Sequence, residues 1–147
     1  MNCPTFTITL PSELRMLSVA RTFVEAVCQT WQMDRAVLHA LVLVTGEAVT
    51  NIVRHAHRDR PRAQLELQLQ ICPEHVILTF TDQGEPFDIN AVPHLNPAEL
   101  RIGGRGVYLM RTLMDEVSCT PRGGGQSGNV LRLVKRWTPA ASLRDVG

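Results

Sequence analysis

Apolar residues recur at every second position in three segments of the chain, with mostly polar residues between them. The three segments are 5–10, 63–71 and 76–81. This period of two predicts half-buried strands, each with one face on a core. Only the short Cys72–Glu74 turn separates the second and third segments, so they are predicted to form an antiparallel hairpin.

Two helices are predicted between the first strand and the hairpin. Apolar residues recur at steps of three and four over 12–31, with Ser12 as a plausible N-cap. A second helix is predicted from a cap at Asp34 to about His57. Its middle, 37–53, is apolar nearly all round, which places it centrally in the fold. The few polar side chains on such a helix must be paired or functional.

The second half of the chain combines glycine-rich turns with three further elements. Residues 85–103 contain three prolines and little periodicity, which is typical of a loop or lid. The glycine cluster 103–106 then opens an amphipathic helix. Two final strands are predicted at 116–121 and 129–137, joined by the glycine-rich hairpin loop 123–128.

This order of elements predicts an α+β fold in two layers. We expect a mostly antiparallel sheet covered on one face by about three helices. A single domain over 1–137 accounts for all of them, and 138–147 are expected to form a flexible tail.

Composition limits the class of protein. The 147 residues are 44% hydrophobic and 20% charged, and the formal net charge is +1. These values are typical of a globular domain and give no support to bulk electrostatic binding of nucleic acid or an acidic membrane. No uninterrupted apolar run reaches the roughly 18 residues of a membrane span. The first ten residues lack the pattern of a signal peptide.

The four cysteines are far apart in the sequence and form no CxxC pair. They are Cys3, Cys28, Cys72 and Cys119. A disulfide framework or a zinc site is therefore not expected, and four reduced, largely buried thiols are predicted. The expected compartment is the cytoplasm.

Three segments carry candidate chemistry. Glu47 and Asn51 lie four residues apart on the central helix, so they share a face about 6 Å apart along the axis. Their oxygens suit a hard cation such as Mg²⁺, and the carboxylate alone can act as a general base. Such a pair is also common as an ordinary structural pair on helices, which is the better interpretation if it is considered alone.

The second segment is Asp82-Gln83-Gly84-Glu85-Pro86-Phe87-Asp88, directly after a predicted strand. Its first carboxylate can accept a hydrogen bond from an exocyclic amine, and Gly84 lets a planar base approach the backbone. An ordinary Asp-x-Gly turn is the alternative. The third segment is the glycine cluster, whose backbone N–H groups and helix dipole can bind an anion. It matches neither a Walker A loop nor GxGxxG, and a flexible turn is its alternative.

Together and in this order, the three segments resemble the N, G1 and G2 boxes of the GHKL ATPase/kinase superfamily, whose ATP-binding domain has the Bergerat fold. The likeness is greatest to the bacterial anti-sigma-factor serine/threonine kinases and spans nearly the whole chain. Glu47-Ala48-Val49-Thr50-Asn51 with Arg54-His55-Ala56 resembles the N box. Asp82-x-Gly84-x-Pro86-Phe87-Asp88 resembles the G1 box, and Gly103-Gly104-x-Gly106-Val107 resembles the G2 box.

The resemblance implies a role for each of these residues. Asn51 would be the magnesium ligand and Glu47 the base that activates the attacking hydroxyl. Asp82 would bind adenine, with Gly84 beside it. The remaining residues implied to contact the nucleotide are Arg54, His55, Phe87, Gly103, Gly104, Arg105, Gly106 and Val107. Arg105 departs from the pattern, because the family usually has an apolar residue between the two glycines.

The resemblance also implies a function and partners. The protein would use ATP and Mg²⁺ to phosphorylate a serine on an anti-sigma-factor antagonist, and it would sequester a sigma factor. A homodimer is expected, with the first helix and first strand as plausible contact surfaces. An ATP-binding module that regulates by docking alone is the alternative. Histidine autokinases are disfavoured, because only about 35 residues precede the helix that bears Glu47.

Overall fold

The described part of the chain forms one antiparallel sheet with helices on a single face. In the computed structural model, residues 3–58, 60–92 and 105–139 are described. Their five strands lie in the order β1-β2-β3-β5-β4. The strands are β1 (Thr5–Pro11), β2 (Gln64–Ile71), β3 (His75–Thr81), β4 (Glu116–Pro121) and β5 (Asn129–Arg136).

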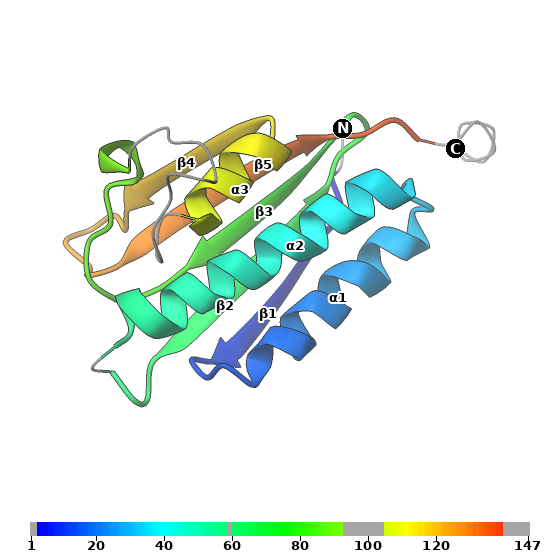
Figure 1. The fold of residues 1–147 in the computed structure, drawn as a ribbon. Coiled ribbons are helices and arrows are strands. Elements are labelled where there is room, and N and C mark those ends of the chain that lie inside the picture. The colour runs from blue at the N-terminus through cyan, green and yellow to red at the C-terminus, as the bar shows by residue number, and fades with distance from the viewer. Residues whose placement is uncertain (1–2, 59, 93–104, 140–147) are drawn as a thin grey trace.

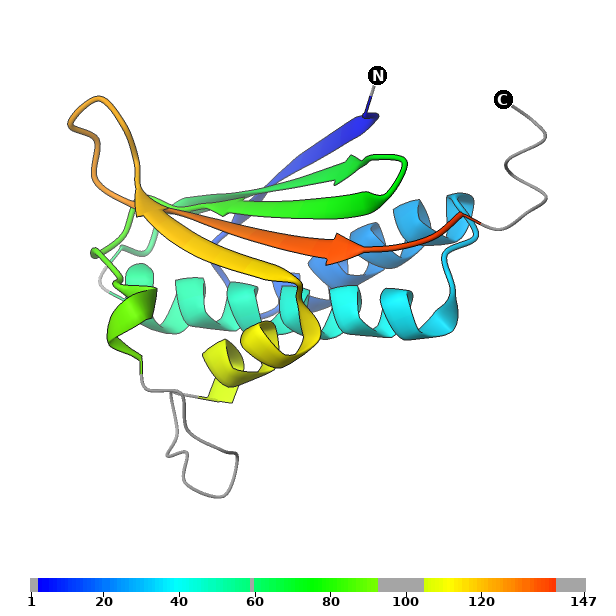
Figure 2. The same cartoon turned by 90° about the horizontal axis from the view of Figure 1, so that it is seen from above.

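Three α-helices of the described residues lie on the same side of this sheet (Figures 1 and 2). They are α1 (Met16–Thr30), α2 (Arg35–Asn51) and α3 (Arg105–Leu113). A π-helix, Ile52–Ala56, continues α2, and a 3₁₀-helix, Ile89–Ala91, follows β3. The central helix α2 packs against α1 on one side and α3 on the other. The predicted α+β architecture is confirmed.

The core lies between the sheet and the helices because the strands alternate as the sequence indicates. Ile8, Leu67, Phe80 and Leu131 occupy one row across four strands. Leu67 and Phe80 in this row have no exposed surface. On the opposite face, Gln68 and its row neighbours are mostly polar. The period-two pattern therefore identified which face of each strand is buried.

The continuous helix of α2 and the π-helix is the most apolar segment. Residues Arg35–Ala56 form 22 helical residues whose most apolar window has a mean hydropathy of 1.7. By length and composition alone this helix is sufficient to cross a membrane, contrary to the expectation that no segment would be. Half of that window is buried inside the domain, which is also typical of a core helix.

The predicted N-cap is correct for α2 but not for α1. Asp34 caps α2 as expected, because its Oδ1 accepts the Val37 N–H at 2.8 Å. The prediction that Ser12 caps the first helix is wrong. The first helix begins at Met16 after Arg15, which makes no side-chain cap. The Ser12 hydroxyl instead hydrogen-bonds the His57 imidazole, 45 residues away in the chain.

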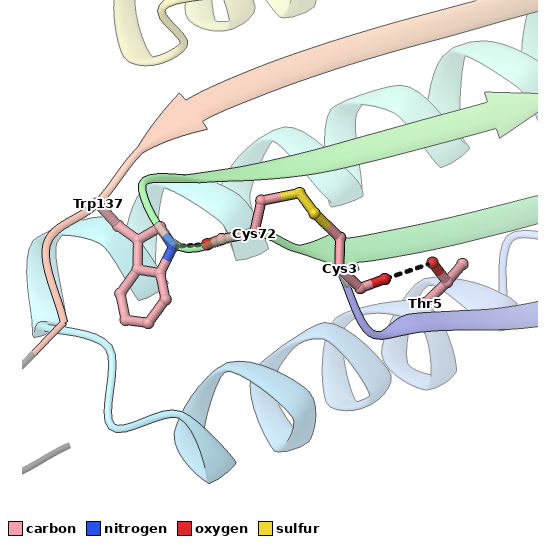
Figure 3. The surroundings of a disulfide bond; sticks show 4 residues. All are labelled: Cys3, Thr5, Cys72 and Trp137. Atoms are coloured by element: carbon pink, nitrogen blue, oxygen red, sulfur yellow. Dashed lines mark hydrogen bonds between the residues drawn. A yellow bond between two sulfur atoms is a disulfide. The ribbon is translucent and has the colours of Figure 1, made fainter. Parts of the chain in front are cut away.

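A disulfide joins Cys3 to Cys72, so the prediction of four reduced thiols is wrong for this pair (Figure 3). The pairing of β1 with β2 is the physical reason. Thr5 faces Gln70, and the Ile71 N–H donates to the Pro4 carbonyl. The two cysteines extend that register by two residues, and their Cα atoms are 4.6 Å apart. Cys28 and Cys119 are free.

Reduction of this disulfide is expected to lower the free energy of unfolding by about 2–4 kcal/mol, because the bond closes a long loop in the unfolded chain. The cysteines are 69 residues apart. Urea unfolding with and without reductant measures the difference. A Cys3→Ser, Cys72→Ser variant serves as the control, since its midpoint should not respond to reductant. Equal midpoints for oxidised wild type and this variant would contradict the expectation.

Candidate functional site

A cavity of about 340 Å³ lies between the helical layer and one end of the sheet. This volume is within the range of small-molecule sites. Most of its wall is apolar, including Ala48, Ile52, Pro86, Ile89, Met110 and Leu131. Its polar lining comes from Asn51, His55, Asp82, Glu85 and Asn129. An apolar cavity with a few polar groups suits a flat organic ring that carries hydrogen-bonding substituents.

Asp82 is held in place by the strand next to its own. It directly follows β3, and its backbone N–H donates to the Asn129 carbonyl at 3.0 Å. One carboxylate oxygen, Oδ1, accepts the N–H groups of Gly84 at 2.8 Å and Asn129 at 3.2 Å, and the Asn129 Nδ2 at 3.1 Å. The other oxygen, Oδ2, lies at the long distance of 3.5 Å from that amide. Oδ2 therefore retains acceptor capacity for a group in the cavity.

Gly84 is required by its contact with the helix that continues α2. A methyl group at this position would lie 2.0 Å from the Ala56 carbonyl oxygen. The same carbonyl accepts the Glu85 N–H at 3.1 Å. Gly84 is not among the lining residues of the cavity, and its contact with a planar ring stays a prediction. The glycine allows the turn to lie directly on the C-terminal end of the π-helix.

At the other end of the cavity, α3 contacts the face of α2 that carries the predicted cation ligand. A methyl group on Gly106 would lie 3.0 Å from Glu47 Oε2 and 3.1 Å from Asn51 Nδ2. Within the described residues, the Asn51 carboxamide takes part in no hydrogen bond. The structure therefore brings residues of all three predicted segments to one cavity, since Asn51, Asp82 and Val107 line it, and it places Gly106 against Glu47 and Asn51.

The family assignment follows from a comparison with protein-family models. Residues 10–135 match the family described as the histidine kinase-like ATPase domain. The chain belongs to this family. The curated relatives include a serine-protein kinase RsbW of Oceanobacillus iheyensis, 28% identical over 116 residues that cover 74% of this chain and 73% of that protein. Another RsbW, from Staphylococcus epidermidis, is 35% identical over 91 residues, or 56% and 57% of the two chains.

Solved structures share the fold at lower identity. The SiaB–SiaC complex of Pseudomonas aeruginosa contains a chain with a TM-score of 0.65 and 14% identity, and the match covers 89% of both chains. The RsbU and RsbW domains of Rv1364c from Mycobacterium tuberculosis give a TM-score of 0.62 and 17% identity. That match covers 93% of this chain but only 34% of the longer mycobacterial chain.

The histidine kinase-like ATPase domain places its predicted site residues unevenly around the cavity. Asn51, His55, Asp82, Phe87 and Val107 line it. Glu47 is half-buried next to Gly106 but is not part of the lining. Arg54 and Arg105 are exposed and do not line it either. Gly103 and Gly104 fall outside the described residues.

Asn129 is the main residue of this ATPase domain that the sequence did not indicate. It is 4% exposed and opens β5 beside the end of β3. Its Nδ2 donates to the Glu85 carbonyl at 2.7 Å as well as to Asp82, and its Oδ1 accepts the Phe87 N–H at 3.0 Å. Only knowledge of the β3–β5 pairing shows that this asparagine and Asp82 are neighbours.

Cys119 also lines the cavity, from β4. Burial raises the pKa of its thiol to about 11, and the negative charges of Asp82 and Asp88 add to the increase. The thiol is therefore protonated near neutral pH and acts as a small apolar group in the wall. It is not a candidate nucleophile.

Replacement of Asn129 by alanine is expected to lower the free energy of unfolding by about 1–3 kcal/mol, since it leaves buried polar groups of the turn without partners. The loss should appear as a lower midpoint in urea unfolding. Asn90→Ala is the control, because Asn90 is an exposed asparagine of the 3₁₀-helix that follows β3. If both variants unfold at the wild-type midpoint, Asn129 does not organise this turn.

Proposed function

We propose that this protein is an ATP-dependent serine/threonine kinase and anti-sigma factor. It phosphorylates a serine on an anti-sigma-factor antagonist and sequesters a sigma factor. The observation that carries the proposal is that Asn51, Asp82 and Val107 line one cavity in a histidine kinase-like ATPase domain, and that Gly106 lies against Asn51. Curated relatives named serine-protein kinase RsbW support the reaction. Residues 1–137 are proposed to form this domain, and positions 140–147 of the predicted tail fall outside the described residues.

Adenine is assigned to the end of the cavity next to Asp82. The open acceptor Oδ2 suits the exocyclic amine of adenine, while Oδ1 is already occupied by the turn and by Asn129. Apolar side chains such as Ile52, Met110 and Leu131 supply faces for the ring. Phe87, which is 45% exposed, lies at the cavity and can cover the nucleotide.

The phosphates and Mg²⁺ are assigned to the end of the cavity near Gly106. The residues fit the metal, because the Asn51 oxygen is a hard ligand that no described side chain occupies and the half-buried Glu47 carboxylate lies beside the same glycine. Mg²⁺, when bound, neutralises charge on the phosphate oxygens. Gly103, Gly104, Gly106 and Val107 are proposed to border the phosphates. Arg54 and Arg105 are proposed to add positive charge nearby, and His55 is proposed to contact the nucleotide.

Glu47 is proposed as the general base. In the transfer, the serine oxygen of the antagonist forms a bond to the γ-phosphorus, and the bond from that phosphorus to the β,γ-bridging oxygen breaks. ADP leaves with the electron pair, and the serine proton passes to the Glu47 carboxylate. The products are ADP and a phosphoserine on the antagonist. Glu47 lies on the rigid central helix, which suits a group that must be positioned accurately.

The partners and compartment form part of the same proposal. The solved complex of SiaB with SiaC supports docking of a partner protein on this fold. For a homodimer, the edge strand β1 offers unpaired backbone groups and the half-buried Phe6 and Ile8.

The cytoplasm is proposed as the compartment. Since disulfides are rare there, the redox state of Cys3 and Cys72 in the native cell tests that placement.

The position of Glu47 favours one alternative, a docking module that binds ATP without transferring phosphate, because this side chain is not part of the cavity lining. Pull-down from the native cell with and without ATP, followed by incubation with γ-labelled ATP and mapping of phosphosites, separates the two. Label on a serine of a captured protein supports the kinase. Tight ATP binding without label supports the docking module, and absence of ATP binding overturns both.

A further inference from the structure

His57 joins three segments that are distant in the sequence. It follows the π-helix, and only 4% of its surface is exposed. Its Nε2 accepts the backbone N–H of Gln83 at 3.1 Å, in the turn after β3. Its Nδ1 lies 2.9 Å from the hydroxyl of Ser12, in the connection between β1 and α1. Ser12 is itself fixed, because its N–H donates to the Ala63 carbonyl at 3.0 Å.

These two contacts determine the protonation state of the imidazole. A backbone N–H can only donate, so Nε2 must present a lone pair to Gln83. The single proton of the neutral ring is therefore on Nδ1, which donates to the Ser12 hydroxyl. A second proton on Nε2 would place two N–H groups against each other and break the contact with Gln83.

Gln83 lies in the turn between Asp82, which lines the adenine end of the cavity, and Gly84, which packs against the helix that continues α2. Asp82 precedes it, Gly84 follows it, and the Gly84 N–H donates to the Asp82 carboxylate at 2.8 Å. The Gln83 carbonyl accepts from the Arg60 guanidinium and from the Ser127 hydroxyl at 3.2 Å. His57 supplies the partner for the other backbone group of Gln83, its N–H.

We propose that His57 is a positioning residue that keeps the Asp82–Gly84 turn in the shape that binds adenine, and does so only while its Nε2 is unprotonated. The inference rests on the proposed nucleotide-binding function. Because His57 can be protonated, the affinity for ATP and ADP then depends on pH through a residue that does not itself contact the nucleotide.

The groups around the imidazole ring determine the pH range over which nucleotide affinity changes. Burial lowers the pKa of His57 below 6.5, the Asp82 carboxylate opposes that change, and the Arg60 guanidinium adds to it. Ser12, which faces the ring from the β1–α1 connection, does not titrate in this range. Since the folded pKa is depressed, the hydrogen bond to Gln83 contributes fully above about pH 6.5 and is lost as pH falls through the folded pKa.

Isothermal titration of ADP into the full chain between pH 5 and pH 8 tests the proposal. His57→Leu removes the acceptor and is expected to weaken ADP binding about tenfold at pH 7.5, since it leaves the half-buried Gln83 N–H without its partner. His57→Gln keeps an acceptor near the Nε2 position and does not titrate. We expect it to bind like wild type at pH 7.5 and to lose affinity less than wild type towards pH 5.

The controls separate positioning from general destabilisation. His39→Gln changes an exposed histidine of α2 and should reproduce the wild-type pH profile. Inorganic tripolyphosphate lacks the adenine ring. Wild type, His57→Leu, His57→Gln and His39→Gln should therefore bind it with the same affinity. Wild-type ADP affinity in His57→Leu, or an identical pH profile in wild type and His57→Gln, would overturn the proposal.

A second measurement does not depend on nucleotide binding. The ¹⁵N spectrum of the imidazole should show His57 at pH 7.5 with its proton on Nδ1, and the Gln83 amide should exchange slowly with solvent. A proton on Nε2 would refute the inference directly. Failure of wild type to bind ADP would instead refute the proposed function, and the spectrum would then decide by itself whether His57 holds the turn.

Discussion

Replacing Glu47 with glutamine is expected to slow phosphoryl transfer to the antagonist serine by about 10²–10⁴-fold, the range in which general bases contribute. The glutamine has nearly the same size and stays beside Gly106, but it cannot accept the serine proton. ATP affinity should remain within about twofold, because Glu47 does not line the cavity. Single-turnover transfer from γ-labelled ATP measures the rate, and fluorescence titration measures the affinity.

Glu116→Gln is the matched control for this variant. Glu116 lies at the edge of the sheet in β4, where it faces Arg132 at 4.0 Å, away from the cavity. Its transfer rate should equal that of wild type. Normal transfer by Glu47→Gln would show that this carboxylate is not the base. An equal loss of transfer and of ATP affinity would show that Glu47 serves binding rather than proton transfer.

Replacing Asn51 with alanine is expected to weaken Mg²⁺-dependent ATP binding by more than about 100-fold. The substitution removes the one side-chain oxygen that we assign to the metal, and Mg²⁺ takes only one or two such ligands in nucleotide sites. The loss should be seen when ATP is titrated with Mg²⁺ present. With EDTA in place of Mg²⁺, wild type and variant should bind ATP with similar, weak affinity.

Thr50→Ala provides the comparison for Asn51→Ala. Thr50 is the preceding residue of α2, and its hydroxyl donates to the Gly46 carbonyl within the same helix. The control should keep Mg²⁺-dependent binding. Unfolding midpoints of both variants near that of wild type would show that the fold is intact. If Asn51→Ala binds Mg²⁺-ATP normally, the assignment of the metal ligand is wrong.

The parts of the fold that could be predicted depend on local pattern. Period-two alternation located the strands, and the largely apolar stretch 37–53 identified the central helix. The Asp34 cap was predictable because it acts within one turn of the chain. The motif order indicated Asn51 and Asp82, and both line the same cavity. For the strands, the central helix and the cap, each signal lies within a few residues of the structure that it forms.

The features that could not be predicted depend on contacts between distant residues. Ser12 has the composition of a helix cap, but a histidine 45 residues away takes its hydroxyl. Asn129 becomes part of the site only through the pairing of β5 with β3. The disulfide was missed for the same reason. Spacing along the chain indicated that Cys3 and Cys72 were unrelated, whereas the register of β1 against β2 places them together.

The disulfide has a mechanical consequence. When the bond is formed, residues 3–72 are a closed covalent ring that contains β1, α1, α2 and β2, and therefore Glu47 and Asn51. Asp82 and Asn129 lie in the open part of the chain. Tension applied at the two ends, as a protease or translocase applies it, can extend only the part beyond Cys72. Pulling would therefore strip β3, β4 and β5 from the sheet and dismantle the adenine end, while the ring that carries the phosphate end could not be drawn out to full length.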